Sequence, residues 1–219
     1  MKPIFRSPRL ILATVAALFA TVVIAETSLR YVATPGSKMK IEGTSTIHDW
    51  TVEGSIIAGY VEVDSSFPLD PSKETPADLK LTPKVEVSIP VRSLKSGKST
   101  MDSVMHGAMK QEEHPKIEYR LLEMKPRART AGAPFVFDTT GTLKVAGVTR
   151  TNNMEVTMTP MAANKIKWVG SSAIKMTDFG IQPPAPKIAL GAIKTGDEVK
   201  VSFEWVTAQK AAPATATTN

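Results

Sequence analysis

Hydrophobic residues alternate with polar ones along most of this chain, and the alternation predicts β-strands. Two alternating runs, residues 85–91 and 117–121, flank a short segment with a different spacing, residues 99–109. In that segment the apolar side chains recur at i, i+3, i+4, i+7 and i+8, which is typical of one face of a helix. The spacing therefore predicts strand, helix and strand, with one helix in an otherwise strand-rich protein.

The predicted helix has recognisable ends and one apolar stripe. Ser99 stands where a capping residue is expected, with Asp102 three residues on. Pro115 ends the segment, because the residue before a proline is disfavoured in helical geometry. The stripe either packs against the sheet as core or forms a soft wall that adapts to an apolar ligand. It consists of Met101, Val104, Met105, Ala108 and Met109.

Further alternating runs bring the count to about eight strands, joined mostly by short turns. This pattern predicts an all-β, antiparallel sheet with no βαβ unit. Gly59, where the parity of the alternation changes, predicts a bulge, and the proline-rich residues 67–83 predict a loop. Eight strands can close into a barrel with room for one ligand. A sandwich fits the same pattern, whereas the charged outward positions argue against a membrane-embedded barrel.

The N-terminus reads as an export signal. Residues 1–25 combine three basic residues with a long apolar run and small residues before Ala25, which predicts a signal peptide cut after Ala25 and a periplasmic protein. The run is short of the roughly 20 residues that a membrane span needs, which favours cleavage over the alternative of a retained anchor. We divide the rest into a lead-in (residues 26–37), a β-domain (38–208) and a disordered tail (209–219) of Ala, Thr and Pro.

Composition excludes several kinds of site. The precursor carries a net charge of +6, and removing residues 1–25 lowers it to +3, too little for a dedicated nucleic-acid binder. The pair Arg127 and Arg129 is interpreted as a solvated face. The absence of cysteine excludes disulfides, thiolate metal sites and a catalytic thiol. His106 and His114 lack zinc-site spacing and are interpreted as a solvated helix end.

Ser45, His48 and Asp49 invite comparison with a catalytic triad. Neighbouring residues of a strand point to opposite faces, so His48 and Asp49 should diverge, and no nucleophile-elbow motif is present. We interpret them as a polar junction between two strands. The sequence predicts no enzyme, no metal and no cofactor.

The ordered set of motifs resembles the YceI family. The resemblance is carried by residues 43–50, by 88–94 with 114–119 after the helix, by the hairpin of residues 141–149 and by 175–181 with Pro183 and Pro184 behind. It spans residues 39–207 and implies a lipocalin-like antiparallel barrel, exported to the periplasm, that binds a polyisoprenoid or another long amphiphile without catalysis.

The hypothesis is therefore a binding protein with a long apolar ligand in the barrel interior. The alternative is an interaction module whose barrel is filled with side chains and whose mouth loops bind a partner protein. The volume of the barrel interior distinguishes the two hypotheses. The sequence is also compatible with a homodimer. The predicted ligand-binding residues are Val87, Ile89, Met105, Met109, Tyr119, Phe137, Trp168 and Phe203.

Overall fold

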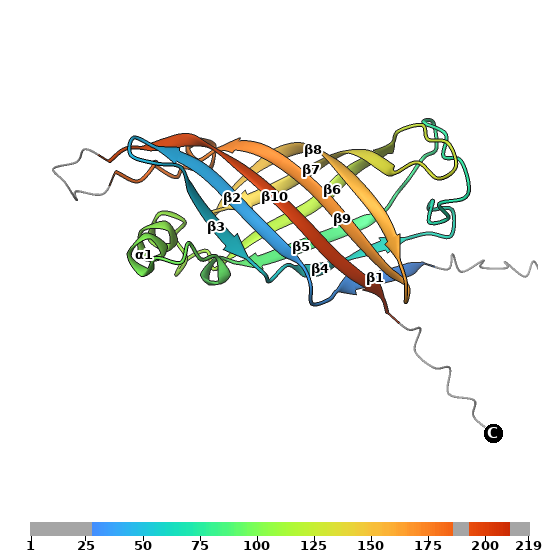
Figure 1. Cartoon of the computed structure of the whole chain (residues 1–219), viewed down its shortest axis with the longest axis horizontal. Coiled ribbons are helices and arrows are strands. Elements are labelled where there is room, and N and C mark those ends of the chain that lie inside the picture. The colour runs from blue at the N-terminus through green and yellow to red at the C-terminus, as the bar shows by residue number, and fades with distance from the viewer. Residues whose placement is uncertain (1–27, 186–192, 211–219) are drawn as a thin grey trace, which may run out of the picture.

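The computed structural model describes residues 28–185 and 193–210, which form one antiparallel sheet that closes on itself (Figure 1). Eight strands form the closed ring, in the order β1, β4, β5, β6, β7, β8, β9 and β10, with β10 paired back to β1. A hairpin of β2 and β3 extends this ring, because β2 pairs with the first part of β10 and β1 with its last residues. The predicted eight-stranded barrel is confirmed.

The strands range from 5 residues in β1 to 15 residues in β10. Their bounds are β1 Leu29–Ala33, β2 Lys38–Ser45, β3 Trp50–Gly54, β4 Ala58–Val63, β5 Lys84–Pro90, β6 Lys116–Pro126, β7 Phe135–Val145, β8 Val148–Met161, β9 Lys165–Lys175 and β10 Thr195–Gln209. One α-helix, α1, covers Ser99–Ala108, and two short 3-10 helices cover Val91–Ser93 and Thr177–Phe179. No helix among the described residues has the length and apolar character needed to cross a membrane.

Two boundaries differ from the sequence predictions. The expected lead-in, residues 26–37, contains β1, whose Tyr31 is buried in the core. The expected continuous strand after Trp50 is divided into β3 and β4. Gly59 lies at the predicted irregularity with φ +136°, and there the Glu86 carbonyl comes so close that no other side chain fits. The predicted signal peptide and most of the predicted tail lie outside the described residues.

Helix α1 lies where the barrel wall has no strand. At this end β3 has β2 on one side, and the segment that leads to α1 occupies the other. Glu53 and Lys95 exchange two backbone hydrogen bonds of 2.8 Å across that edge. The segment before α1 therefore fills the space beside β3, and α1 follows it at this end of the barrel.

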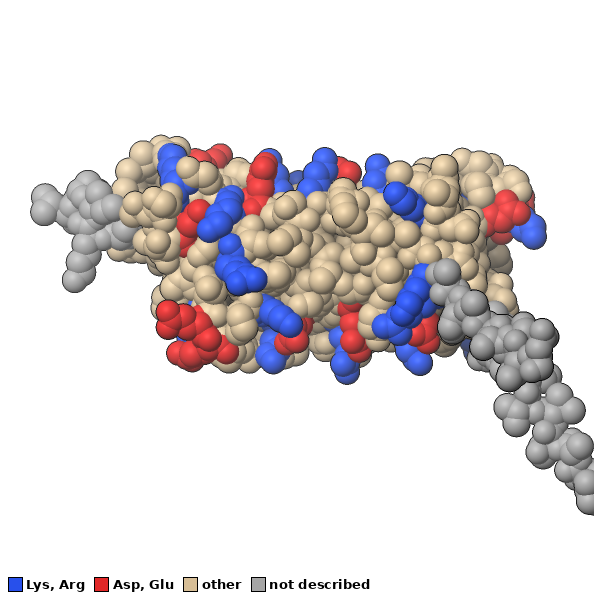
Figure 2. Space-filling view, turned by 90° about the horizontal axis from the view of Figure 1, so that it is seen from below, with Lys and Arg blue, Asp and Glu red and all other residues tan. Residues whose placement is uncertain are grey.

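The outer surface is charged and mixed. Along the face seen in Figure 2, basic and acidic side chains stand close together. Many of them pair across neighbouring strands, as Lys38 does with Glu204 at 3.0 Å and Arg120 with Glu86 at 3.1 Å. Such exposed pairs contribute little stability each. They keep the outside of the barrel polar while the apolar residues face inward.

Candidate functional site

The barrel holds a cavity of about 590 Å³ whose lining extends from α1 to the middle of the barrel. This volume lies within the usual range for small-molecule sites. The wall consists of the inward residues of the strands together with one face of α1, and it is almost entirely apolar. A barrel filled with its own side chains would leave no space of this size.

Seven of the eight predicted site residues line this cavity. They are Val87, Ile89, Met105, Met109, Tyr119, Trp168 and Phe203. Phe137 was placed wrongly: it is buried on β7, outside the lining, because its ring stacks on Phe67 with centroids 5.8 Å apart. That these residues bind a ligand stays a prediction.

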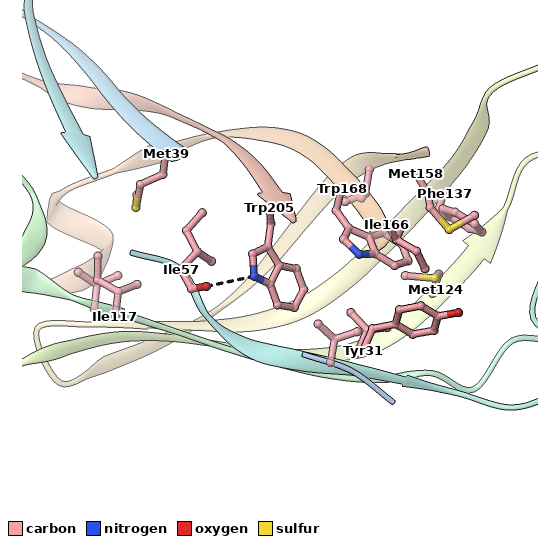
Figure 3. Packing of buried hydrophobic residues seen from close by; sticks show 14 of the residues in the cluster. Tyr31, Met39, Ile57, Ile117, Met124, Phe137, Met158, Ile166, Trp168 and Trp205 are labelled. Carbon is pink, nitrogen blue, oxygen red and sulfur yellow. Dashed lines mark hydrogen bonds between the residues drawn. The ribbon is translucent and has the colours of Figure 1, made fainter. Parts of the chain in front are cut away.

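Phe67 closes the end of the barrel opposite α1. It belongs to the proline-rich loop between β4 and β5, yet it is 6% exposed and contacts Phe137 and Trp168. Figure 3 shows Trp168, Phe137, Met158 and Met124 gathered at this end, beyond Trp205. The loop was predicted, but its inward aromatic was not, although Phe67 is the one aromatic residue between residues 61 and 83.

Arg129 corrects the prediction of a solvated basic face. Its neighbour Arg127 is half-exposed and pairs with Asp138 at 2.6 Å and Glu155 at 2.7 Å. Arg129 is buried. It donates to the carbonyls of Pro71, Lys73 and Ala133 at 2.7, 2.7 and 2.9 Å, and its guanidinium stacks on Phe135. This contact fixes the proline-rich loop against the β6–β7 turn.

At the other end, α1 forms one side of the mouth. Its predicted methionine stripe faces the cavity, with Met101, Met105 and Met109 in the lining. The predicted cap is wrong: Lys98 precedes the first turn and no side chain caps it. Asp102 instead accepts hydrogen bonds from the backbone N–H and the hydroxyl of Ser96, both at 2.7 Å.

These hydrogen bonds hold the helix against the preceding loop. The Ser96 backbone N–H, and then its hydroxyl, hold the pKa of Asp102 below its usual value of 3.8. The imidazole of His106 adds a second tie, because its Nε2 lies 3.0 Å from the Leu94 carbonyl oxygen. His106 is therefore half-buried rather than part of a solvated helix end.

Three aromatic side chains of the wall lie flat over glycines on neighbouring strands. A Cβ atom at Gly43 would fall 2.2 Å from Trp50, and one at Gly170 would fall 2.8 Å from Phe203. Tyr119 covers Gly141 in the same way. Because each ring occupies the space of a missing side chain, it adds apolar wall without filling the interior.

Both buried tryptophans have their N–H groups satisfied. Trp168 donates to the Thr207 hydroxyl at 3.1 Å, and Trp205 donates to the Ile57 carbonyl at 3.2 Å (Figure 3). Together with Trp50 they line the cavity, so every tryptophan in the sequence contacts it. Trp205 is thus part of both the buried core and the cavity wall.

Tyr119 is different, since its hydroxyl oxygen is buried without a hydrogen-bond partner. Burial raises the pKa of Tyr119, and the nearby Thr139 hydroxyl offsets this only in part. The Thr139 hydroxyl itself donates to the Met154 carbonyl at 2.9 Å. The Tyr119 phenol is therefore neutral, and its oxygen is enclosed beside Thr139.

The triad-like residues do not converge. The Ser45 hydroxyl donates to the carbonyl of His48 at 2.7 Å, not to its ring, and the ring nitrogen Nδ1 lies 2.9 Å from the Asp49 carbonyl. They form the β2–β3 turn at the mouth, as the junction interpretation predicts. Residues 28–185 and 193–210 contain no group of three or more acidic or histidine side chains arranged to hold a metal.

Comparisons with known proteins agree with this geometry. A family model described as a YceI-like domain matches residues 31–207. No curated protein matches the chain.

Several solved structures share the fold at low identity. A polyisoprenoid binding domain from Saccharophagus degradans, implicated in plant cell wall breakdown, is 12% identical with a TM-score of 0.57, covering 83% of this chain and 98% of that one. BcnA from Burkholderia cenocepacia is 17% identical with a TM-score of 0.56, covering 78% and 95%. The YCEI protein of Campylobacter jejuni is 18% identical with a TM-score of 0.51, covering 74% and 85%.

Proposed function

The chain belongs to the YceI-like family, and on that premise we propose that it is an exported binding protein that holds one long apolar chain, such as a polyisoprenoid, inside its barrel without transforming it. The observation that carries the proposal is the cavity of about 590 Å³ with an apolar wall. The solved domain from Saccharophagus degradans, described as polyisoprenoid binding, supports the ligand class.

The driving force is the burial of hydrocarbon. Each methylene transferred from water to an apolar site contributes about 0.8 kcal/mol, less the cost of ordering the chain. The wall provides contacts along the whole cavity, from Met101 and Ile47 at the mouth to Trp168 and Trp205 at its inner end. A flexible hydrocarbon that lies along these residues is removed from water over its whole length.

The shape of the site favours entry past α1. The opposite end is closed by Phe67 and by the loop that Arg129 holds. Around the mouth, Ile47 and Val104 line the cavity while remaining 61% and 37% exposed. Apolar side chains in this position give a chain its first contacts as it leaves another apolar phase.

Export completes the proposal. Residues 1–25 supply the signal, and the mature barrel would work in the periplasm, where a water-insoluble chain needs a carrier between membranes. Intact mass and N-terminal sequencing of the protein from the periplasmic fraction test this part. We expect a mature chain that begins at Glu26, and an uncleaved chain in the cytoplasm would overturn it.

Tryptophan quenching tests the binding itself. All three tryptophans line the cavity, so a brominated C18 hydrocarbon delivered from cyclodextrin should quench their fluorescence saturably at one molecule per chain. The non-brominated hydrocarbon should bind without quenching and should displace the brominated one. Quenching that is absent, or that never saturates, would contradict an interior site.

A further inference from the structure

Methionine is concentrated in the wall of the cavity. Nine of the ten methionines of the sequence belong to the described residues, and seven of these nine line the cavity. The described lining holds two leucines, Leu121 and Leu143. Leucine would give a wall of similar volume and apolar character, so the sulfur atoms are what distinguishes this wall. The seven methionines are Met39, Met101, Met105, Met109, Met124, Met154 and Met176.

The seven methionines differ in their access to solvent. Three of them are at most 7% exposed, and the other four are partly buried. Met101 and Met105 belong to the partly buried group and lie on α1, the helix that forms one side of the mouth. Val104, between them in the sequence, lines the cavity and is 37% exposed. The side chains of Met101 and Met105 are therefore within reach of a small solute at the mouth.

The two sides of α1 are held by different interactions. Asp102 and His106 tie the helix to the preceding loop by hydrogen bonds to Ser96 and to the Leu94 carbonyl. On the cavity side, Met101 and Met105 pack against the hydrophobic core. A polar group introduced at either sulfur atom would be placed against an apolar wall, which is unfavourable.

A methionine thioether can acquire such a polar group by oxidation. Hydrogen peroxide transfers one oxygen atom to the sulfur: the O–O bond breaks and an S–O bond forms. The sulfur is oxidised, and the departing hydroxide takes the proton of the transferred oxygen and leaves as water. The resulting sulfoxide is polar and accepts hydrogen bonds, whereas the thioether is only a weak acceptor. The reaction thus changes the chemistry of the wall without changing the backbone.

We propose that Met101 and Met105 form an oxidation site that controls how firmly the barrel retains its apolar chain. Their sulfoxides make the mouth side of the wall polar and weaken binding, and reduction by methionine sulfoxide reductases restores it. A bound chain covers both side chains, so the loaded protein is oxidised there more slowly than the empty one. This inference rests on the proposed function and adds to it a modification site that regulates binding.

Two methionines outside the cavity lining serve as internal references for the test. Met161 is 45% exposed, and Met158 is 1% exposed. The empty protein and the protein loaded with the non-brominated C18 hydrocarbon are treated with hydrogen peroxide, and peptide mass mapping measures the addition of oxygen at each methionine. In the empty protein Met101 and Met105 should react faster than Met158. Loading should slow both of them and leave the reaction of Met161 unchanged.

Quenching titrations then compare the affinity of each protein for the brominated chain before and after oxidation. In wild type the affinity should fall about ten-fold, the effect of one polar group left unpaired in an apolar site. In the double variant Met101→Leu and Met105→Leu the two affinities should be equal. Treatment of the oxidised wild type with reductases for both sulfoxide epimers should restore binding. Met161→Leu is the matched control and should lose affinity as wild type does.

The possible results separate the inference from the proposed function. The inference is wrong if Met101 and Met105 are as unreactive as Met158, or if loading does not protect them. It is also wrong if their oxidation leaves the affinity unchanged, or if the double leucine variant loses as much affinity as wild type. In each of these cases the hydrocarbon site stands. If the protein does not bind the brominated chain before oxidation, the proposed function fails, and the inference fails with it.

Discussion

The ring of Tyr119 lies over Gly141, so that a Cβ atom at Gly141 would fall 2.3 Å from both Cζ and Oη of the tyrosine. The contact joins β6 to β7 and keeps a large aromatic side chain against the wall. Any residue with a side chain at position 141 must push the ring toward the cavity. The open interior therefore depends on a glycine.

Replacing this glycine should narrow the site. Gly141→Ala is expected to destabilise the fold by about 1–3 kcal/mol through overpacking and to weaken binding of the brominated chain. Adding Tyr119→Leu should relieve both effects. Thermal unfolding and quenching titrations measure them. Gly107→Ala on α1 is the control, because nothing lies within 4 Å of its added Cβ. Normal binding by Gly141→Ala would show that the ring has room to move.

A charge on the cavity face of α1 should affect the ligand more than the fold. Met105→Asp places a carboxylate in the cavity lining at a half-buried position. The free energy of unfolding should change by less than about 2 kcal/mol, while retention of the bound hydrocarbon should fall at least ten-fold. Ser103→Asp, on the exposed side of the same helix, should retain ligand. Met109 is buried, so Met109→Asp should reduce both stability and retention.

If Met105→Asp reduced protein stability and ligand retention equally, the apolar face of α1 would be part of the protein core and not a ligand-binding wall. Denaturant unfolding of the lipid-free protein provides the stability, and dissociation of the loaded chain provides the retention.

The sequence pattern predicted the antiparallel sheet and most of the wall, because alternation specifies which side chain faces inward once a sheet closes. The choice of a barrel over a sandwich came from the family resemblance. It missed β1, since Leu29–Ala33 is too short to show its period. It placed Phe137 in the site because alternation gives the inward face but not the depth along the barrel. Depth is decided by Phe67, which arrives from a loop with no periodicity at all.

Asn152 and Ser172, which also line the cavity, were missed for a related reason. Asn152 stands in a polar run of β8, residues 149–153, where the inward member cannot be told from its outward neighbours. Ser172 is preceded by Ser171, so the sequence does not show which of these two serines faces inward. Only the register between β7, β8 and β9 shows which of each pair faces the cavity.

Removing the aromatic at the closed end should lengthen the cavity. Phe67→Ala is expected to cost about 3–5 kcal/mol of stability, as for other buried phenylalanines. The surviving folded protein should accept hydrocarbons several carbons longer than wild type does. Phe67→Leu, a milder change, should shift the preferred length less. Displacement assays over a series of chain lengths give the preference.

Leu69→Ala, in the same loop but outside the cavity lining, should leave the preferred length unchanged. If both Phe67 variants preferred the same hydrocarbon length as wild type, the bound hydrocarbon would end before it reaches Phe67.

Lowering the pH should weaken the attachment of α1 to the preceding loop, because Asp102 becomes protonated. Since hydrogen bonds from Ser96 hold the pKa of Asp102 below 3.8 in the folded protein, the ionised carboxylate stabilises the fold above that value. This stability is lost as the pH falls below about 4 toward the folded pKa. Thermal unfolding and ligand release between pH 5 and pH 3 should therefore show a steeper acid loss in wild type than in Asp102→Asn.

Asp78→Asn, in the exposed part of the proline-rich loop, is the matched control and should keep the wild-type profile. Identical profiles for wild type and Asp102→Asn would remove Asp102 from the account of acid sensitivity.

The most direct measurement is a native mass spectrum of the protein purified from its own cells without detergent. We expect a bound adduct of defined mass, released on denaturation as a lipid with a long apolar chain, and a reduced adduct in Met105→Asp but not in Ser103→Asp. A protein that always carries the bare mass of its chain, and that also fails to bind hydrocarbon after purification, would contradict the interior site.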